Sequence, residues 1–208
     1  MTLPVVVIGG GGHARVVLDT LRTAGLAVSG VVDPRPETAD RLPAGIQLIG
    51  RDLQEIKADR VQVVLGVGSI DVGEKNPRPR IFADTKAAGF TFMLLRHPSA
   101  ILSAAVELGD GVQIMAGAIL QPGVSVGANC IVNTGASLDH DCRIGDHVHI
   151  APGAVLSGGV IVGDGSHIGT GAIVIQNVRI GAGSMIAAGA VVTRDVLPGA
   201  RVRPGPQG

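Results

Sequence analysis

The fold is decided by residues 131–162, which read IVNTGASLDHDCRIGDHVHIAPGAVLSGGVIV. Every sixth residue of this stretch is aliphatic, and the same period runs without a gap from Leu102 to Val192. Three residues after each aliphatic, from Gly111 to Asp195, comes Gly, Asn, Asp or His, and only the first such position, Ala105, departs from this rule. These residue types tolerate a positive φ angle. Each hexad therefore combines an inward aliphatic, a left-handed turn and, one place later, a small inward residue.

This pattern predicts a left-handed parallel β-helix over residues 101–196. Three short strands and three turns close one triangular coil, and about five coils stacked ~4.8 Å apart make a prism roughly 25 Å tall. A Gly-rich β-sandwich, the alternative, would show a period of two interrupted by irregular turns. The composition fits a narrow, repetitive interior, because 46% of the residues are apolar, 32 are Gly, and the aromatic residues are three Phe.

The first half predicts a Rossmann-like α/β domain. A strand at 3–8 leads into GGGGHA (9–14), a helix with the sequence VVLDTLRTAG, and a second strand, VSGVVD, that ends at Asp33. Further strands are expected at 61–67 and 90–95, and a helix at 78–88. A unit of this size is half of a two-lobed dinucleotide domain, which favours a single nucleotide over NAD.

The glycine loop of this domain resembles a phosphate-binding motif. Gly9, Gly11 and Ala14 fit G-x-G-x-x-G/A, and Asp33 follows about 20 residues later. Glycines let a phosphate approach the backbone, and the start of the helix offers free N–H groups. The alternative is that the glycines only make a tight turn. The domains are thus expected at 1–96 (nucleotide-sugar-binding, Rossmann-like) and 97–198 (β-helix), followed by a C-terminal tail at 199–208.

Charge and cysteine content exclude several classes of function. The formal net charge is zero, so neither nucleic acid nor an anionic membrane is an expected partner. We expect a soluble, cytoplasmic chain, because MTLPVVV lacks the basic region of a signal peptide and no apolar run is long enough to span a membrane. Cys130 and Cys142 fall in the small inward column and are interpreted as core residues, not as nucleophiles. No ligand cluster of familiar spacing predicts a metal site.

A small Rossmann-like domain before a hexapeptide β-helix resembles the sialic-acid O-acetyltransferase and nucleotide-amino-sugar N-acetyltransferase family. The resemblance is carried by VVVIGGGGHARVVLD near the start, HPSA at 97–100, and NTGASLDHDCRIGDHVHIAPGAVLSGGV at 133–160. It is strongest toward the sugar 4-N-acetyltransferases. It covers nearly the whole chain except its end, RVRPGPQG, where the family has a G-V-P-A-K-like tail.

The resemblance implies an acetyl-CoA donor, a homotrimer, and a catalytic histidine followed by an acidic residue, which here are His140 and Asp141. The acetyl-CoA contacts that it implies map onto His149, Thr170 and Ala188. The nucleotide-sugar contacts map onto Gly11, Gly12, His13 and Asp33. Among the remaining histidines, His147 is interpreted as a turn residue and His97 as a domain-junction residue.

One outward row of the β-helix is apolar. It contains Ile101, Ile119, Val155, Ile173 and Val191, with Ser137 as the polar exception. Such a ridge predicts a subunit interface, and cover by the N-terminal domain is the alternative. His140 borders this face, whereas His149 lies half a coil away across the prism. The two can share a site only if a neighbouring subunit supplies one of them, as in a closed three-fold ring.

These features predict an N-acetyltransferase that acts on the amine of a nucleotide-linked 4-amino-4,6-dideoxy sugar, for surface polysaccharide or glycan synthesis. His140 is expected to act as general base and Asp141 to orient it. The alternatives are a sugar O-acetyltransferase of the sialic-acid type and a non-catalytic nucleotide-binding trimer. A metal-dependent β-helix hydratase would need three clustered histidines, and only His149 and His167 stack. Whether His13 contacts a phosphate or the acceptor sugar stays open.

Overall fold

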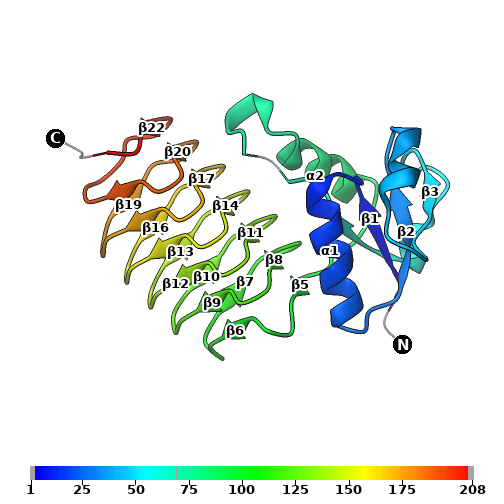
Figure 1. Ribbon diagram of the computed structural model, residues 1–208, viewed down its shortest axis with the longest axis horizontal. Helices are drawn as coiled ribbons and strands as arrows, with labels where there is room; N and C mark the ends of the chain where they lie inside the picture. Colours follow the sequence, from blue (N-terminus) through cyan, green and yellow to red (C-terminus); the bar gives the residue numbers. More distant parts are fainter. Residues whose placement is uncertain (1–2, 69, 206–208) are drawn as a thin grey trace.

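The computed structural model describes residues 3–68 and 70–205, and it has the architecture that the sequence predicts (Figure 1). An α/β domain packs against one end of a triangular, left-handed parallel β-helix, whose coils lead away from that domain toward the C-terminus. We call the β-helix the prism below.

The α/β domain is built on a parallel sheet of order β3-β2-β1-β4. Its elements are β1 (Val5–Ile8), α1 (Gly12–Thr23), β2 (Val28–Val32), β3 (Leu48–Gly50), β4 (Gln62–Leu65) and α2 (Arg78–Ala87), with short 3₁₀ turns η1 (Pro36–Arg41), η2 (Ala58–Arg60) and η3 (Gly73–Lys75). Helix α1 buries Ala14, Val17, Leu18 and Leu21, whose spacing of three to four residues forms one apolar face. This face packs with β1 and β4 in one core cluster.

The segment predicted as a strand at 90–95 differs in the structure. Phe92 makes only an isolated bridge to Val63, and β5 (Leu95–Arg96) pairs with the prism instead of the α/β sheet. The segment is apolar because it lies between two cores. Phe90 and Phe92 pack in one buried cluster, and Leu95 packs in another.

The prism has three faces, each a stack of two-residue parallel strands. The ridge face contains β6 (Ile101–Leu102), β9 (Ile119–Leu120), β12 (Ser137–Leu138), β15 (Val155–Leu156), β18 (Ile173–Val174) and β21 (Val191–Val192). The cleft face contains β5, β8 (Gln113–Ile114), β11 (Ile131–Val132), β14 (His149–Ile150), β17 (His167–Ile168), β20 (Met185–Ile186) and β22 (Arg201–Val202). The third face contains β7 (Glu107–Leu108), β10 (Ser125–Val126), β13 (Arg143–Ile144), β16 (Ile161–Val162) and β19 (Arg179–Ile180).

The left-handed turn column is confirmed from Gly111 to Gly189, including the non-glycine residues Asn129, Asp141, His147 and Asn177. Asp195 is the exception, because it does not have a positive φ. Its Oδ1 accepts the Arg179 N–H at 2.7 Å, and the last coil closes in 16 residues instead of 18, since Ile180 pairs with Val196 and Met185 with Arg201. At the next corner, Gly199 (φ 71°) takes the place that Gly183 has one coil earlier, 16 residues before it. The shortened coil brings part of the predicted tail into the cleft face as β22.

Both cysteines lie in the prism core, as predicted. Cys130 and Cys142 are fully buried, and their thiols donate to the carbonyl oxygens of Gly145 and Ser157 at 3.0 and 3.3 Å. Burial raises the pKa of Cys130 to about 12 and that of Cys142 to about 11. Neither thiol is therefore poised to act as a nucleophile near neutral pH.

The α/β domain docks on the cleft face and the adjoining corner. Gln113 donates from Nε2 to the Leu65 carbonyl at 2.7 Å, and the buried guanidinium of Arg78 donates to Asn129 Oδ1 at 2.8 Å. The ridge face stays uncovered. Its Ile101, Val155, Ile173 and Val191 are 64, 40, 43 and 44% exposed. Cover by the N-terminal domain, the alternative reading of that apolar row, is therefore wrong.

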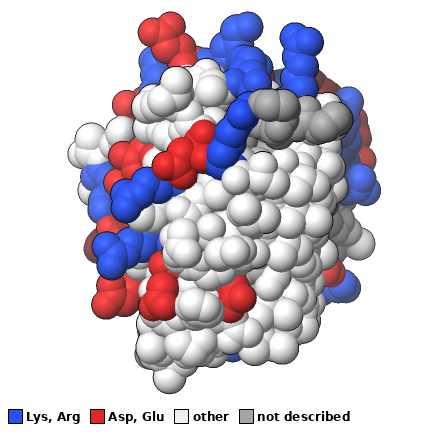
Figure 2. Space-filling model, turned by 90° about the vertical axis from the view of Figure 1, so that its left-hand side faces the viewer, with Lys and Arg blue, Asp and Glu red and all other residues white. Residues whose placement is uncertain are grey.

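Charged side chains are unevenly spread over the end of the prism far from the α/β domain. Seen from that side, they gather toward the top and one edge, and a broad uncharged surface remains (Figure 2). No helix in residues 3–68 and 70–205 is long and apolar enough to cross a membrane.

Candidate active site

A cleft of about 690 Å³ lies between the α/β domain and the prism. One wall is the β1–α1 loop and the start of α1, with Gly11, Gly12 and His13. The opposite wall is the cleft face of the prism, with Asn133 and His149. Side chains of Arg35, Ile70, Asp71 and Lys75 complete the lining. The structure thus brings three predicted substrate residues together with His149, for which the family resemblance implies a contact with the acetyl donor.

The β1–α1 loop requires glycine for geometric reasons. Gly9 has φ +90°, and a Cβ on Gly10 would collide with the Thr38 side chain. Helix α1 follows at once, and no side chain in the described part of the protein caps its N-terminus. Its first N–H groups are therefore available to a bound anion, and the helix dipole favours negative charge there.

Asp33 holds this loop in place. The carboxylate is 2% exposed, and it accepts the Gly10 N–H at 2.7 Å together with the backbone N–H and guanidinium of Arg35. The hydrogen bonds from Arg35 hold the pKa of Asp33 well below its usual range. Asp33 does not line the cleft that contains His149. Its direct contact with a nucleotide stays a prediction, because its oxygens are already engaged.

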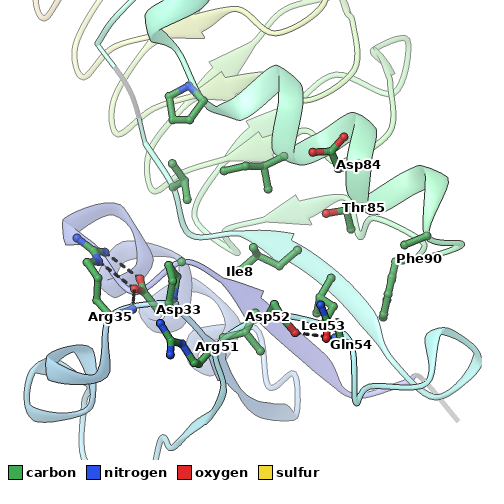
Figure 3. Close-up of a pocket in the computed structure, with 17 residues that line it drawn as sticks. Ile8, Asp33, Arg35, Arg51, Asp52, Leu53, Gln54, Asp84, Thr85 and Phe90 are labelled. Carbon is green, nitrogen blue, oxygen red and sulfur yellow. Dashed lines mark hydrogen bonds and ion pairs between the residues drawn. The ribbon is translucent and has the colours of Figure 1, made fainter.

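Asp33 instead borders a second cavity of about 630 Å³, at the carboxyl ends of β1, β2 and β4 (Figure 3). Its walls are mainly apolar, and Ile8, Leu53 and Phe90 contribute to them. Thr85 and Asp84 reach it from α2, while Arg35 and Arg51 lie on the side of the glycine loop. Both cavities share Gly9, Arg35, Val67 and Pro77, so they adjoin each other at that loop.

Two of the histidines on the cleft face stack on each other. The rings of His149 and His167 meet edge to face at 4.9 Å, and His149 Nε2 is 3.1 Å from Asn133 Nδ2. Burial lowers the pKa of His167, and its buried Nδ1 has no hydrogen-bond partner among residues 3–68 and 70–205. No group of three or more metal-binding side chains occurs among the described residues.

His140 and Asp141 form a hydrogen-bonded pair at the corner between β12 and β13, where the ridge and third faces meet. His140 Nδ1 lies 2.8 Å from Asp141 Oδ2, and the His140 side chain is 63% exposed. The bond to Asp141 raises the pKa of His140, and the charge of Asp139 adds to this effect. Asp141 has a positive φ of 60°, as the turn column predicts.

Gly158 lies directly under the His140 ring. A Cβ at this position would be 2.5 Å from His140 Nε2 and 2.6 Å from Cε1. Gly158 does not have a positive φ, so its backbone conformation does not require glycine. The absence of a side chain instead leaves room for the imidazole.

The candidate residues do not meet in one chain. His140 is at the corner opposite the cleft face, on the far side of the packed interior from His149. Thr170 and Ala188 are exposed in successive coils at the corner between the cleft and ridge faces. Sequence reasoning missed Gln113, Asn133, Arg35 and Lys75. A polar residue in an outward position next to buried strands was the available signal for Gln113 and Asn133.

Known protein families match both parts of the chain. Residues 4–76 match the PglD N-terminal domain, and residues 105–140, 141–176 and 159–194 match the bacterial transferase hexapeptide (six repeats). A comparison of the sequence with curated proteins gave no match.

Solved structures resemble the chain over nearly its whole length. One is PerB from Caulobacter crescentus in complex with CoA and GDP-perosamine, with 38% identity, 94% of this chain and 91% of that chain covered, and a TM-score of 0.83. Another is the acetyltransferase domain of PglB from Neisseria gonorrhoeae in complex with acetyl coenzyme A, with 34% identity, 97% and 96% coverage, and a TM-score of 0.88. WeeI from Acinetobacter baumannii, at 24% identity and a TM-score of 0.78, shares the fold.

Proposed function

Because the chain belongs to the hexapeptide-repeat family of nucleotide-amino-sugar acetyltransferases, and is an acetyltransferase, we propose that it moves an acetyl group from acetyl-CoA to the amine of a nucleotide-linked 4-amino-4,6-dideoxy sugar. The observation that carries this proposal is the cleft in which the glycine loop and the start of α1 face His149 of the prism. A nucleotide held at that loop carries its sugar toward the prism, where the acetyl donor is expected. The product would serve surface polysaccharide or glycan synthesis.

The nucleotide sugar fits the two adjoining cavities from end to end. The apolar cavity beside Phe90 accepts the base and ribose. The diphosphate then lies at the glycine loop, where the N–H groups at the start of α1 and the Arg35 guanidinium neutralise it. The amino sugar extends into the cleft toward Asn133 and His149.

Acetyl-CoA is proposed to lie along the prism corner that carries Thr170 and Ala188, with its thioester directed toward His149. The amine attacks the thioester carbonyl while His140 Nε2 removes a proton from the nitrogen. The tetrahedral intermediate collapses by breaking the C–S bond, and CoA leaves as the thiolate, which the proton on His140 can neutralise. Asp141 accepts the Nδ1–H, which keeps the Nε2 lone pair available and makes the ring a stronger base.

The reaction needs a second copy of the chain, because His140 and the cleft lie on opposite sides of one prism. We propose a homotrimer in which the ridge faces pack around a three-fold axis. Each His140 then reaches the cleft of the adjacent subunit, and three equivalent sites form. The exposed apolar row on the ridge face supports this arrangement.

Release of free CoA thiol tests the proposal. Acetyl-CoA and the purified enzyme would be combined with UDP-, GDP- and CMP-linked 4-amino sugars, and with the matching 4-hydroxy sugars and free sialic acid as hydroxyl acceptors. The proposal expects turnover with at least one amine and a mass gain of one acetyl group on that product. Turnover with a hydroxyl acceptor alone would replace it with O-acetylation. Binding of nucleotide without any turnover would indicate a non-catalytic trimer.

Replacing Gly158 with alanine tests whether turnover depends on the position of the His140 ring. The new methyl group displaces the exposed His140 side chain, which can rotate away at little cost in stability. A displacement of about 1 Å at a reacting group can cost about 10²-fold in rate, so we expect kcat to fall by about 10- to 100-fold with an unchanged melting temperature. Gln176→Ala, at the same corner one coil later, is the matched control and should keep full activity. Normal turnover in Gly158→Ala would show that the ring position is not critical.

A further inference from the structure

The Gln113 side chain joins the two domains through both ends of its amide. Gln113 is 1% exposed, and its position on β8 places it between the end of β4 and the start of α1. One end of the amide lies 2.7 Å from the Leu65 carbonyl oxygen, and the other lies 2.7 Å from His13 Nε2. A carbonyl oxygen can only accept a hydrogen bond, so the NH₂ end faces Leu65. The Gln113 oxygen therefore faces His13.

This orientation decides which nitrogen of His13 carries hydrogen. The Gln113 oxygen has no hydrogen to give, so His13 Nε2 must donate. A second proton on the ring is opposed by burial and by the nearby Arg78 guanidinium, and the pKa of His13 is lowered to about 4. At neutral pH the ring is therefore uncharged, with a bare lone pair on Nδ1.

His13 lines the cleft between the two domains, and its Nδ1 is the ring nitrogen that Gln113 leaves unbonded. It has no hydrogen-bond partner within residues 3–68 and 70–205. In the same part of the chain, His167 Nδ1 is the one buried side-chain nitrogen or oxygen that lacks a partner. His13 Nδ1 is consequently not buried, and the cleft is the space that His13 lines.

We propose that Gln113 fixes His13 as the neutral Nε2–H tautomer, so that Nδ1 accepts a hydrogen bond from a hydroxyl or amino group of the bound sugar and makes no bond to the diphosphate. This inference rests on the proposed function and specifies how the enzyme recognises the acceptor sugar. Phosphate oxygens at neutral pH carry no hydrogen to donate, and their charge is repelled by the Nδ1 lone pair. Sugar hydroxyls and amines carry donors. Gln113 is thus a positioning residue, and His13 selects for a donor group on the sugar.

Nitrogen-15 spectra of the histidine rings test the tautomer without using activity. The enzyme is labelled with ring-¹⁵N histidine, and His13→Asn identifies the signals of His13 by their loss. We expect a protonated Nε2 and an unprotonated Nδ1 at neutral pH, persisting to about pH 5. Addition of the nucleotide-linked amino sugar should shift the Nδ1 signal, whereas the nucleoside diphosphate alone should leave it unchanged. A proton on Nδ1, or an equal shift with the diphosphate alone, would overturn the proposal.

Gln113→Glu adds a kinetic test. A contact of His13 with the sugar predicts weaker binding of the nucleotide sugar in this variant, whereas a contact with the diphosphate predicts tighter binding. The carboxylate still accepts the Nε2–H but cannot donate to the Leu65 carbonyl, so an unchanged melting temperature must first show that the domains stay docked. Its charge favours the imidazolium, which cannot accept a hydrogen bond. We expect the KM for the nucleotide sugar to rise about tenfold at low pH, the effect of one lost hydrogen bond, and to recover as the pH rises. The KM for acetyl-CoA should stay unchanged. Tighter binding of the nucleoside diphosphate alone would indicate a phosphate contact and contradict the proposal. If no acceptor is ever found for the enzyme, the tautomer of the wild-type ring is still measurable.

Discussion

Replacing His140 with alanine should lower kcat by at least about 10²-fold, the low end of what a general base contributes. The ring is largely exposed and packs into no core, so folding and assembly should be unaffected. The KM values for both substrates should change little, because the glycine loop and the proposed acetyl-CoA corner are untouched. Thiol release measures turnover, and His97→Ala is the matched control, since among the described residues the His97 ring bonds only to Ser99 of its own loop. Unchanged turnover in His140→Ala would remove the general-base assignment.

The pH dependence gives the same assignment an independent check. A general base works in its unprotonated form, so kcat/KM should rise with pH through the pKa of His140. The hydrogen bond that His140 donates to Asp141 and the charge of Asp139 raise that pKa, so this rise should be centred above the usual value for histidine, about 6.5. Asp141→Asn removes the carboxylate that contributes most to the raised pKa of His140. The rise in kcat/KM should therefore move to lower pH, and its plateau should be lower because the base is weaker. A rise that stays in place in Asp141→Asn would mean that another group titrates.

The prism could be predicted from sequence because its packing repeats. Each inward aliphatic and each left-handed turn recurs at a fixed spacing, and the buried strands impose the same demand in every coil. The last turn shows where this reasoning ends. Asp195 satisfies the residue pattern as well as Asp141 does, yet its carboxylate caps the Arg179 N–H and the coil closes two residues early. The six-residue period of the sequence carries no information about a side-chain hydrogen bond that shortens one turn.

The candidate site was only partly accessible to such reasoning. The turn column accounts for Asp141, but no backbone requirement accounts for His140 beside it, and this contrast makes the pair stand out in the sequence. Gln113 carries a weaker signal, a polar side chain in an outward position. Its importance comes from the Leu65 carbonyl and the His13 ring, which belong to another domain and lie far away in the sequence. Only the docking of the two domains reveals that the Gln113 amide bonds to both groups.

A charge in the middle of the ridge face should dissociate the assembly and abolish activity together. Val155 points outward and is 40% exposed in a single chain, flanked by Ile173 on the next strand. In the proposed trimer, Val155→Asp would bury three carboxylates close together, and burial of even one unpaired carboxylate costs several kcal/mol. The inward aliphatics are untouched, so each chain should stay folded, with an unchanged circular dichroism spectrum. Light scattering should report a monomer, and the thiol assay should report no turnover.

Ile161→Asp is the matched control for this substitution. Ile161 is also an outward aliphatic in the first position of its strand, but it lies on the third face between Arg143 and Arg179. An aspartate there gains opposite charges as neighbours, so the trimer and its activity should persist. An intact, active trimer of Val155→Asp would show that the ridge face is not the subunit interface. An active monomer would show that one chain holds the whole site.

Mixed trimers decide whether two chains share each site. His140→Ala lacks the proposed base and His149→Ala lacks the proposed donor contact, so each variant alone should be nearly inactive. When both are co-expressed in equal amounts, a site that takes His140 from one chain and His149 from its neighbour is intact about a quarter of the time in a three-fold ring. Activity should therefore return to about a quarter of the wild-type value. A site contained in one chain predicts no recovery, because every chain carries one of the two lesions. Recovery thus depends on the separation of His140 and His149 across the prism, and that separation is the structural reason for a trimer.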